Sequence, residues 1–208
     1  TNSSAAFQLQ NSSGQVGFNL DTNTSNLISN PSFETDTTGW TAHGAAAIAR
    51  VTSQSFDQQA GLEINATAAA NDGARFAYTL LSSTQYTLSM YIKGDGAFFS
   101  TLQIGRSENG STDTSCATGL GTSSANWNRV TCTFTTGTVT GSPYIYIKQT
   151  DATDRNFYID AVQLETAASA TQYRNAKAAI NGNLVVNAGQ NSLSNATLFV
   201  QSNAGGEG

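Results

Sequence analysis

Apolar and polar residues alternate with a period of two along most of the chain. Between residues 86 and 93, Tyr86, Leu88, Met90 and Ile92 share one face of an extended segment, and polar or smaller residues fill most of the other. This alternation predicts a half-buried β-strand. Similar runs are AAAIARV (45–51), GLEINA (61–66), ARFAYTL (74–80), FFSTLQIG (98–105), NRVTCTF (128–134), YIYIKQ (144–149) and FYIDAVQL (157–164). Because turn residues separate these runs and the helical period is almost absent, we expect an all-β fold with two antiparallel sheets.

Composition narrows the range of functions. The chain has 208 residues, which is enough for a proper core, and its 19 glycines suit tight turns. The formal net charge is −5 and lysine and arginine form no cluster, which excludes a nucleic-acid partner. No apolar run approaches the ~20 residues of a membrane span, so we expect no membrane insertion. The polar first residues do not form a signal peptide, so we expect one to have been removed, or the module to lie inside a larger protein.

Two cysteines, Cys116 and Cys132, are the only ones in the chain. Cys132 belongs to a predicted strand and Cys116 to the loop before it. One pair at short range in a chain of secreted character favours a disulfide, worth about 3 kcal/mol in the chain-entropy model. The alternative is two unpaired, small apolar side chains.

Four segments together resemble a known family. They are NLISNPSFETDTTGW (26–40), YTLSMYIKG (86–94), WNRVTCTFT (127–135) and NFYIDAVQLE (156–165). The opening Asn-Pro-x-Phe-Glu run followed by Gly-Trp, and the closing Tyr-Ile-Asp strand, resemble the jelly-roll carbohydrate-binding modules of bacterial xylanases and β-glucanases. The resemblance covers residues 26–165. It implies a jelly-roll sandwich that binds polysaccharide or cell-surface glycan outside the cell and is not an enzyme.

The same resemblance implies a structural calcium ion. In that family its ligands include the glutamate of the Phe-Glu pair and the aspartate of the closing strand, which are Glu34 and Asp160 here. Calcium takes about six to eight oxygen ligands, so Asn30 and a carbonyl from residues 57–61 are weaker candidates for the rest. The alternative is that Glu34 caps a turn and Asp160 makes a local hydrogen bond.

Strand parity suggests a glycan-binding face. Aromatic rings on a sheet can stack on pyranose rings while amides and charged groups bond to hydroxyls. The residues that parity places on the outer face are Tyr91, Phe99, Gln103, Arg129, Tyr144 and Tyr146, with Ile145 and Ile147 facing the core. Alternatively the tyrosines cover a sheet edge or pack under a loop, and a slip of one residue would reverse every assignment.

The sequence contains no recognisable set of catalytic residues. His43 is the only histidine and is expected in a loop, so it can complete neither a triad nor a zinc site. Glu34 and Asp36 are neighbours in sequence, which does not indicate the facing carboxyl pair of a glycosidase.

The two ends of the chain share a short pattern. AAFQLQNSSG (5–14) and ATLFVQSNAG (196–205) align without a gap. We therefore expect three parts: an N-terminal β repeat unit (1–25), the jelly-roll domain (26–165) and a C-terminal β repeat unit (166–208). Flanking repeats resemble the stalks of bacterial surface fibres and phage tail fibres, which predicts an adhesin that contacts its own copies through terminal strands. The alternative is a purely structural filament subunit that assembles by strand pairing.

Overall fold

The computed structural model describes residues 7–10, 16–20 and 26–173. The chain divides into two compact units, Thr1–Ala178 and Ala179–Gly208, and the second lies outside the described residues. In the described part, no helix is long and apolar enough to cross a membrane.

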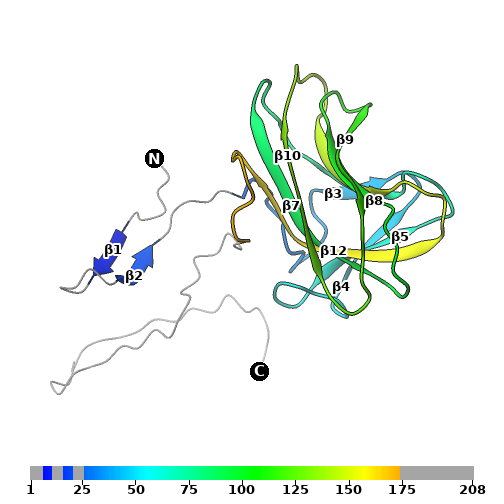
Figure 1. The fold of residues 1–208 in the computed structure, drawn as a ribbon, viewed down its shortest axis with the longest axis horizontal. Helices are drawn as coiled ribbons and strands as arrows, with labels where there is room; N and C mark the ends of the chain where they lie inside the picture. The colour runs from blue at the N-terminus through cyan, green and yellow to red at the C-terminus, as the bar shows by residue number, and fades with distance from the viewer. Residues whose placement is uncertain (1–6, 11–15, 21–25, 174–208) are drawn as a thin grey trace. The chain divides into compact units, whose positions relative to one another are not determined.

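Two five-stranded antiparallel sheets form the described domain (Figure 1). The sheet centred on β11, called the β11 sheet below, has the order β3 (Trp40–His43), β6 (Gly73–Ala77), β11 (Tyr144–Gln149), β8 (Leu102–Ser107) and β9 (Asp113–Leu120). The β12 sheet has the order β10 (Asn128–Thr135), β7 (Gln85–Gly94), β12 (Arg155–Glu165), β5 (Gly61–Ala66) and β4 (Ala47–Val51). The expected all-β sandwich is confirmed.

The core lies between the inner faces of the two sheets and follows the alternation in the sequence. Ile145 and Ile147 of β11 are fully buried in it, as parity predicts, and so are Leu88 and Met90 of β7. Trp40 is also a core residue, and its ring lies 5.3 Å from that of Phe76. Burial of such side chains supplies most of the driving force for a sandwich of this kind.

A β-bulge in β12 sets which residues of the closing strand face inward. The pairing of β12 with β7 shifts between Asp160 and Gln163, and Ala161 takes a positive φ of 50°. The bulge turns Asp160 to the outer face while Val162 and Leu164 enter the core. Strict alternation would have placed Asp160, Val162 and Leu164 on one face.

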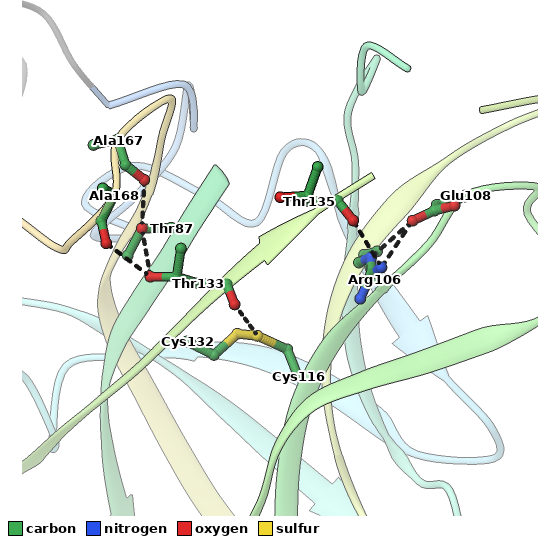
Figure 2. The surroundings of a disulfide bond; sticks show 9 residues. All are labelled: Thr87, Arg106, Glu108, Cys116, Cys132, Thr133, Thr135, Ala167 and Ala168. Carbon is green, nitrogen blue, oxygen red and sulfur yellow. Dashed lines mark hydrogen bonds and ion pairs between the residues drawn. A yellow bond between two sulfur atoms is a disulfide. The ribbon is translucent and has the colours of Figure 1, made fainter. Parts of the chain in front are cut away.

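Two observed strands are not evident from alternation. β3 is short, and β9 consists largely of small polar residues because it is an edge strand that pairs only with β8 among the described residues. Cys116 therefore lies in β9 and not in a loop, which corrects that expectation. The expected disulfide is present, with a Cα–Cα distance of 5.7 Å, and joins β9 to Cys132 on β10 (Figure 2). It connects the edge strands of the two different sheets.

The chain stays bound to the β12 sheet after β12 ends. The Thr87 hydroxyl donates to the Ala167 carbonyl at 2.7 Å, and the Glu165 carboxylate accepts from the Thr171 amide at 3.0 Å (Figure 2 shows the former). Arg129 also donates to the Thr171 carbonyl. Residues 166–173 thus cover part of the outer face of the β12 sheet.

An antiparallel hairpin lies near the N-terminus. It joins β1 (Phe7–Gln10) and β2 (Val16–Leu20). The expected N-terminal β unit therefore contains two paired strands, whereas the expected C-terminal unit lies almost entirely outside the described residues.

Candidate functional site

Six side chains gather on the outer face of the β11 sheet. Tyr144, Tyr146 and Lys148 alternate with the core isoleucines of β11, and neighbouring strands supply the rest. We call this group the Asp113 cluster; it consists of His43, Arg75, Asp113, Tyr144, Tyr146 and Lys148.

Asp113 holds the cluster together. Its carboxylate accepts hydrogen bonds from the Tyr144 hydroxyl at 2.7 Å and from the Lys148 ammonium, and it lies 2.9 Å from Nε2 of His43. Burial acts to raise the pKa of Asp113, but the Lys148 and Tyr144 hydrogen bonds and the nearby charges outweigh it and lower the pKa. Asp113 is therefore an anion that, from β9, fixes side chains of β3 and β11.

The tyrosine rings form the base of the cluster. The His43 ring lies 5.6 Å from the Tyr146 ring, the Lys148 ammonium lies 4.9 Å above Tyr146, and the Arg75 guanidinium lies 5.1 Å over Tyr144. As a result Tyr144 is only 7% exposed and Tyr146 only 1%. Burial raises the pKa of both hydroxyls. Parity assigned these tyrosines to the correct face, but their expected role as an exposed platform is wrong because charged neighbours cover them.

The predicted glycan-binding residues do not share one surface. Gln103 lies on the same face as Tyr146, opposite Lys148 in the register, and is half-buried. Phe99 lies in the connection between β7 and β8, where its ring meets the Arg155 guanidinium at 4.3 Å. Tyr91 and Arg129 lie on the outer face of the other sheet. The structure therefore separates the predicted set into two faces and a loop.

A second group occupies the outer face of the β12 sheet. The Phe56 ring stacks on the Tyr91 ring with an interplanar angle of 14°, and the edge of Trp127 approaches Phe56 at 6.5 Å. Arg129 lies 5.9 Å over Tyr91, and Lys93 donates to the Gln54 side chain at 2.7 Å. We call this group the Phe56 patch; it consists of Gln54, Phe56, Tyr91, Lys93, Trp127 and Arg129. Trp127 is half-buried at this surface and is not a core residue.

The predicted metal ligands meet at the loop that carries Phe56. Oδ2 of Asp160 accepts the backbone N–H groups of Phe56 and Asp57 at 2.6 and 2.8 Å. The Glu34 carboxylate accepts the N–H groups of Gln59 and Ala60 at 3.2 Å. Both carboxylates thus fasten the segment 56–60 through bonds between residues far apart in the sequence, and not through the local hydrogen bond that the alternative gave to Asp160.

The burial of Asp160 is electrostatically unfavourable. Its side chain is fully buried, and burial, with a smaller contribution from the Asp57 charge, raises its pKa to about 7 despite three backbone hydrogen bonds. A divalent cation would offset this buried charge, but the carboxylate oxygens of Glu34 and Asp160 already accept backbone N–H groups, so calcium at this site stays a prediction. The Asn30 side-chain NH2 group donates to the carbonyls of Asp36 and Thr38, and its role as a calcium ligand also stays a prediction. Calcium would supply structural bracing of this loop.

The described residues contain no group of three or more histidine, cysteine or carboxylate side chains suited to a metal. His43 is fixed between the Asn71 carbonyl, 2.8 Å from Nδ1, and Asp113.

Sequence reasoning missed His43, Arg75 and Asp113 of the Asp113 cluster. His43 was assigned to a loop and Asp113 received no role, because β3 and β9 were not recognised as strands. The only signal in the sequence was that His43 ends a short run without glycine or proline and that Asp113 lies near the start of another. Such a signal is too weak to identify a strand.

Solved structures with similar folds include several carbohydrate-binding modules. The xylan-binding domain of family 22 shares 20% identity with a TM-score of 0.60, covering 72% of this chain and 99% of that one. The CBM22-1 xylan-binding domain of Paenibacillus barcinonensis Xyn10C shares 19% identity with a TM-score of 0.57, covering 67% and 94%. The CBM22-1–GH10 modules of Clostridium thermocellum xylanase 10B, complexed with xylohexaose, share 18% identity with a TM-score of 0.59, covering 66% and 28%. At these identities the likeness establishes the fold.

Family membership rests on the sequence itself. No curated protein matches the chain significantly. A family model described as "Carbohydrate binding domain" matches residues 25–154, which is more than half of the chain and includes most of both sheets. The chain therefore belongs to this family of carbohydrate-binding domains.

Proposed function

We propose that this protein is a non-catalytic module that binds a polysaccharide on the outer face of the β11 sheet. The observation that carries the proposal is the Asp113 cluster, which holds charged hydrogen-bonding groups on one sheet face above two buried tyrosine rings. Sugar sites contain a few fixed polar groups of this kind, which bond to hydroxyls. Fixing Asp113 by Tyr144 and Lys148 before binding reduces the entropy lost when a ligand binds.

The proposed ligand class is a β-linked plant polysaccharide, with xylan as the first candidate. Support comes from family membership and from the solved structures of similar fold, which are described as xylan-binding domains. The groups that we expect to reach the sugar are the more accessible ones, which are Arg75, Gln103 and Thr41, together with Asp113 and His43. The tyrosines act mainly by supporting them.

The test is affinity electrophoresis and calorimetry with soluble xylan, β-glucan and mannan. Arg75→Ala and Gln103→Ala remove groups of the proposed face without opening the core. The control is Asn65→Ala, an exposed residue of β5 on the other sheet. Each β11-sheet variant should weaken binding by about tenfold, the loss typical of a hydrogen bond to or from a charged or polar group.

Wild-type affinity in both variants would contradict the location of the site. No binding of the wild type to any of these polysaccharides at millimolar sugar would contradict the function.

We further propose that the module works outside the cell, at a cell surface. The disulfide supports this, because such bonds persist in oxidising compartments. A place in a repetitive fibre or adhesin, with contacts between copies through terminal strands, rests on the repeated terminal pattern alone. Light scattering of the intact protein beside a variant without residues 1–20 tests it, and a monomer in both would contradict it.

A further inference from the structure

We propose that the Phe56 patch is a second sugar-binding site, on the opposite sheet from the Asp113 cluster. Its ligand is a pyranose ring of a polysaccharide, which stacks on the free face of Phe56. The ligand class rests on the proposed function, but the location does not.

The geometry of Phe56 suits stacking. One face of its ring is covered by Tyr91 at a centroid distance of 3.4 Å, yet the residue is 43% exposed, so its accessible area lies mainly on the other face and edge. Trp127 meets Phe56 nearly edge-on, at an interplanar angle of 67°, and so borders the ring without lying parallel to it. The result is a flat aromatic surface of about one sugar ring, the arrangement in which aromatic side chains contact the apolar face of a pyranose.

Hydrogen-bonding groups lie beside the ring. Tyr91 is paired across the sheet with Arg129, and Lys93 follows two residues later on the same face of β7. Lys93 and Gln54 bond to each other, and Arg129 bonds to the Ser89 hydroxyl and to the Thr171 carbonyl. Their remaining donors can serve sugar hydroxyls while their positions stay fixed.

The loop under Phe56 is held rigidly. Asp160 accepts the Phe56 N–H itself, and Glu34 accepts N–H groups three and four residues later. An exposed phenylalanine on a mobile loop would have to be ordered at each binding event, whereas a ring fastened at its own backbone and at its face is already positioned. This fastening distinguishes Phe56 from Phe98, which is 71% exposed in the connection between β7 and β8 and stacks on no other ring within the described part of the chain.

The experiment is an NMR titration of the full ¹⁵N-labelled chain with xylohexaose, cellohexaose and laminarihexaose as separate probes. Amide signals of residues 54–57, 91 and 129 report on the Phe56 patch, and those of residues 75, 103 and 146 report on the Asp113 cluster. The variants are Phe56→Leu, which keeps an apolar side chain but removes the flat ring, and Phe56→Tyr, which restores a ring. Phe98→Ala is the matched control, because it removes another exposed phenylalanine.

At least one probe should shift the signals of the Phe56 patch in the wild type, and Phe56→Leu should weaken that binding about fivefold or more while Phe56→Tyr and Phe98→Ala keep it. Shifts confined to residues 75, 103 and 146, or patch shifts unchanged in Phe56→Leu, would overturn this inference and leave the proposed function intact. Shifts confined to the patch would support the inference and overturn the proposed location on the β11 sheet. No shift with any probe at millimolar concentration would overturn both.

Discussion

The buried carboxyl of Asp160 should make the stability of this protein depend on pH in an unusual direction. Its pKa in the folded protein is raised by burial to about 7, above the ordinary value of 3.8. The folded state therefore binds more protons than the unfolded chain between these two values. In calcium-free buffer the contribution is fully present below about pH 4, and it is lost as the pH rises through about 7.

The size of the effect follows from the shift. About three pKa units at about 1.4 kcal/mol each give an upper bound of about 4 kcal/mol in the free energy of unfolding. For a domain of this size, that corresponds to a change in Tm on the order of 10 °C. Most of the change falls between pH 5 and pH 7.5.

The assay is thermal unfolding from pH 5 to 7.5 in chelator, for the wild type and for Asp160→Asn. The asparagine keeps an oxygen for the Phe56 and Asp57 N–H groups but carries no charge, so the Tm difference between the two proteins isolates the titration. Asp36→Asn is the control, because hydrogen bonds from Thr38 hold the pKa of Asp36 below its usual value and it stays ionised over this range. A wild-type minus Asp160→Asn difference that stays constant from pH 5 to 7.5 would refute the reasoning.

Calcium should reverse this dependence of stability on pH if Glu34 and Asp160 bind it, as the family resemblance predicts. A cation stabilises the ionised carboxylate, so calcium should raise the wild-type Tm most at pH 7.5. The gain is about 2.7 kcal/mol when free calcium is 100-fold above its Kd. Asp160→Asn should lose most of this gain, and an identical wild-type Tm in calcium and in chelator would exclude the site.

Three further outcomes follow from single contacts. Reducing the Cys116–Cys132 disulfide should lower the free energy of unfolding by about 3 kcal/mol, measured by urea unfolding with and without reductant; two alkylated thiols in non-reduced protein would contradict the bond. Gly105→Ala should destabilise the fold strongly, because the new Cβ would lie 2.3 Å from a carbonyl oxygen of β9. In the control Gly137→Ala the new Cβ would meet only a flexible carboxylate, at 3.2 Å, and equal Tm values for the two variants would count against this packing. Asp113→Ala should lower the free energy of unfolding by about 1–3 kcal/mol, because the buried Tyr144 hydroxyl and Lys148 ammonium lose their acceptor. An unchanged midpoint of urea unfolding would show that the cluster is not a stabilising network.

The local sequence determined where the strands with one buried face lie and which of their side chains face the core. In β7 and β11, alternate apolar residues must face the core because a strand turns successive side chains to opposite faces. That rule placed Ile145 and Ile147 in the core and Tyr144 and Tyr146 on the outer face, as observed. The cysteine pair was equally readable, since two cysteines in a short stretch leave a single possible pairing.

The tertiary structure decided how much of each outer face is accessible and which residues share it. Asp113 of β9 and His43 of β3 cover the tyrosines of β11 from distant parts of the chain, and no local pattern encodes that contact. Tyr91 and Tyr146 look alike in sequence, yet they lie on opposite sheets because β7 pairs with β10 and β12 whereas β11 pairs with β6 and β8. Alternation specifies which way a side chain points from its own strand, but strand order and the loops that cross a face depend on long-range pairing, and these decided where the sites of this protein lie.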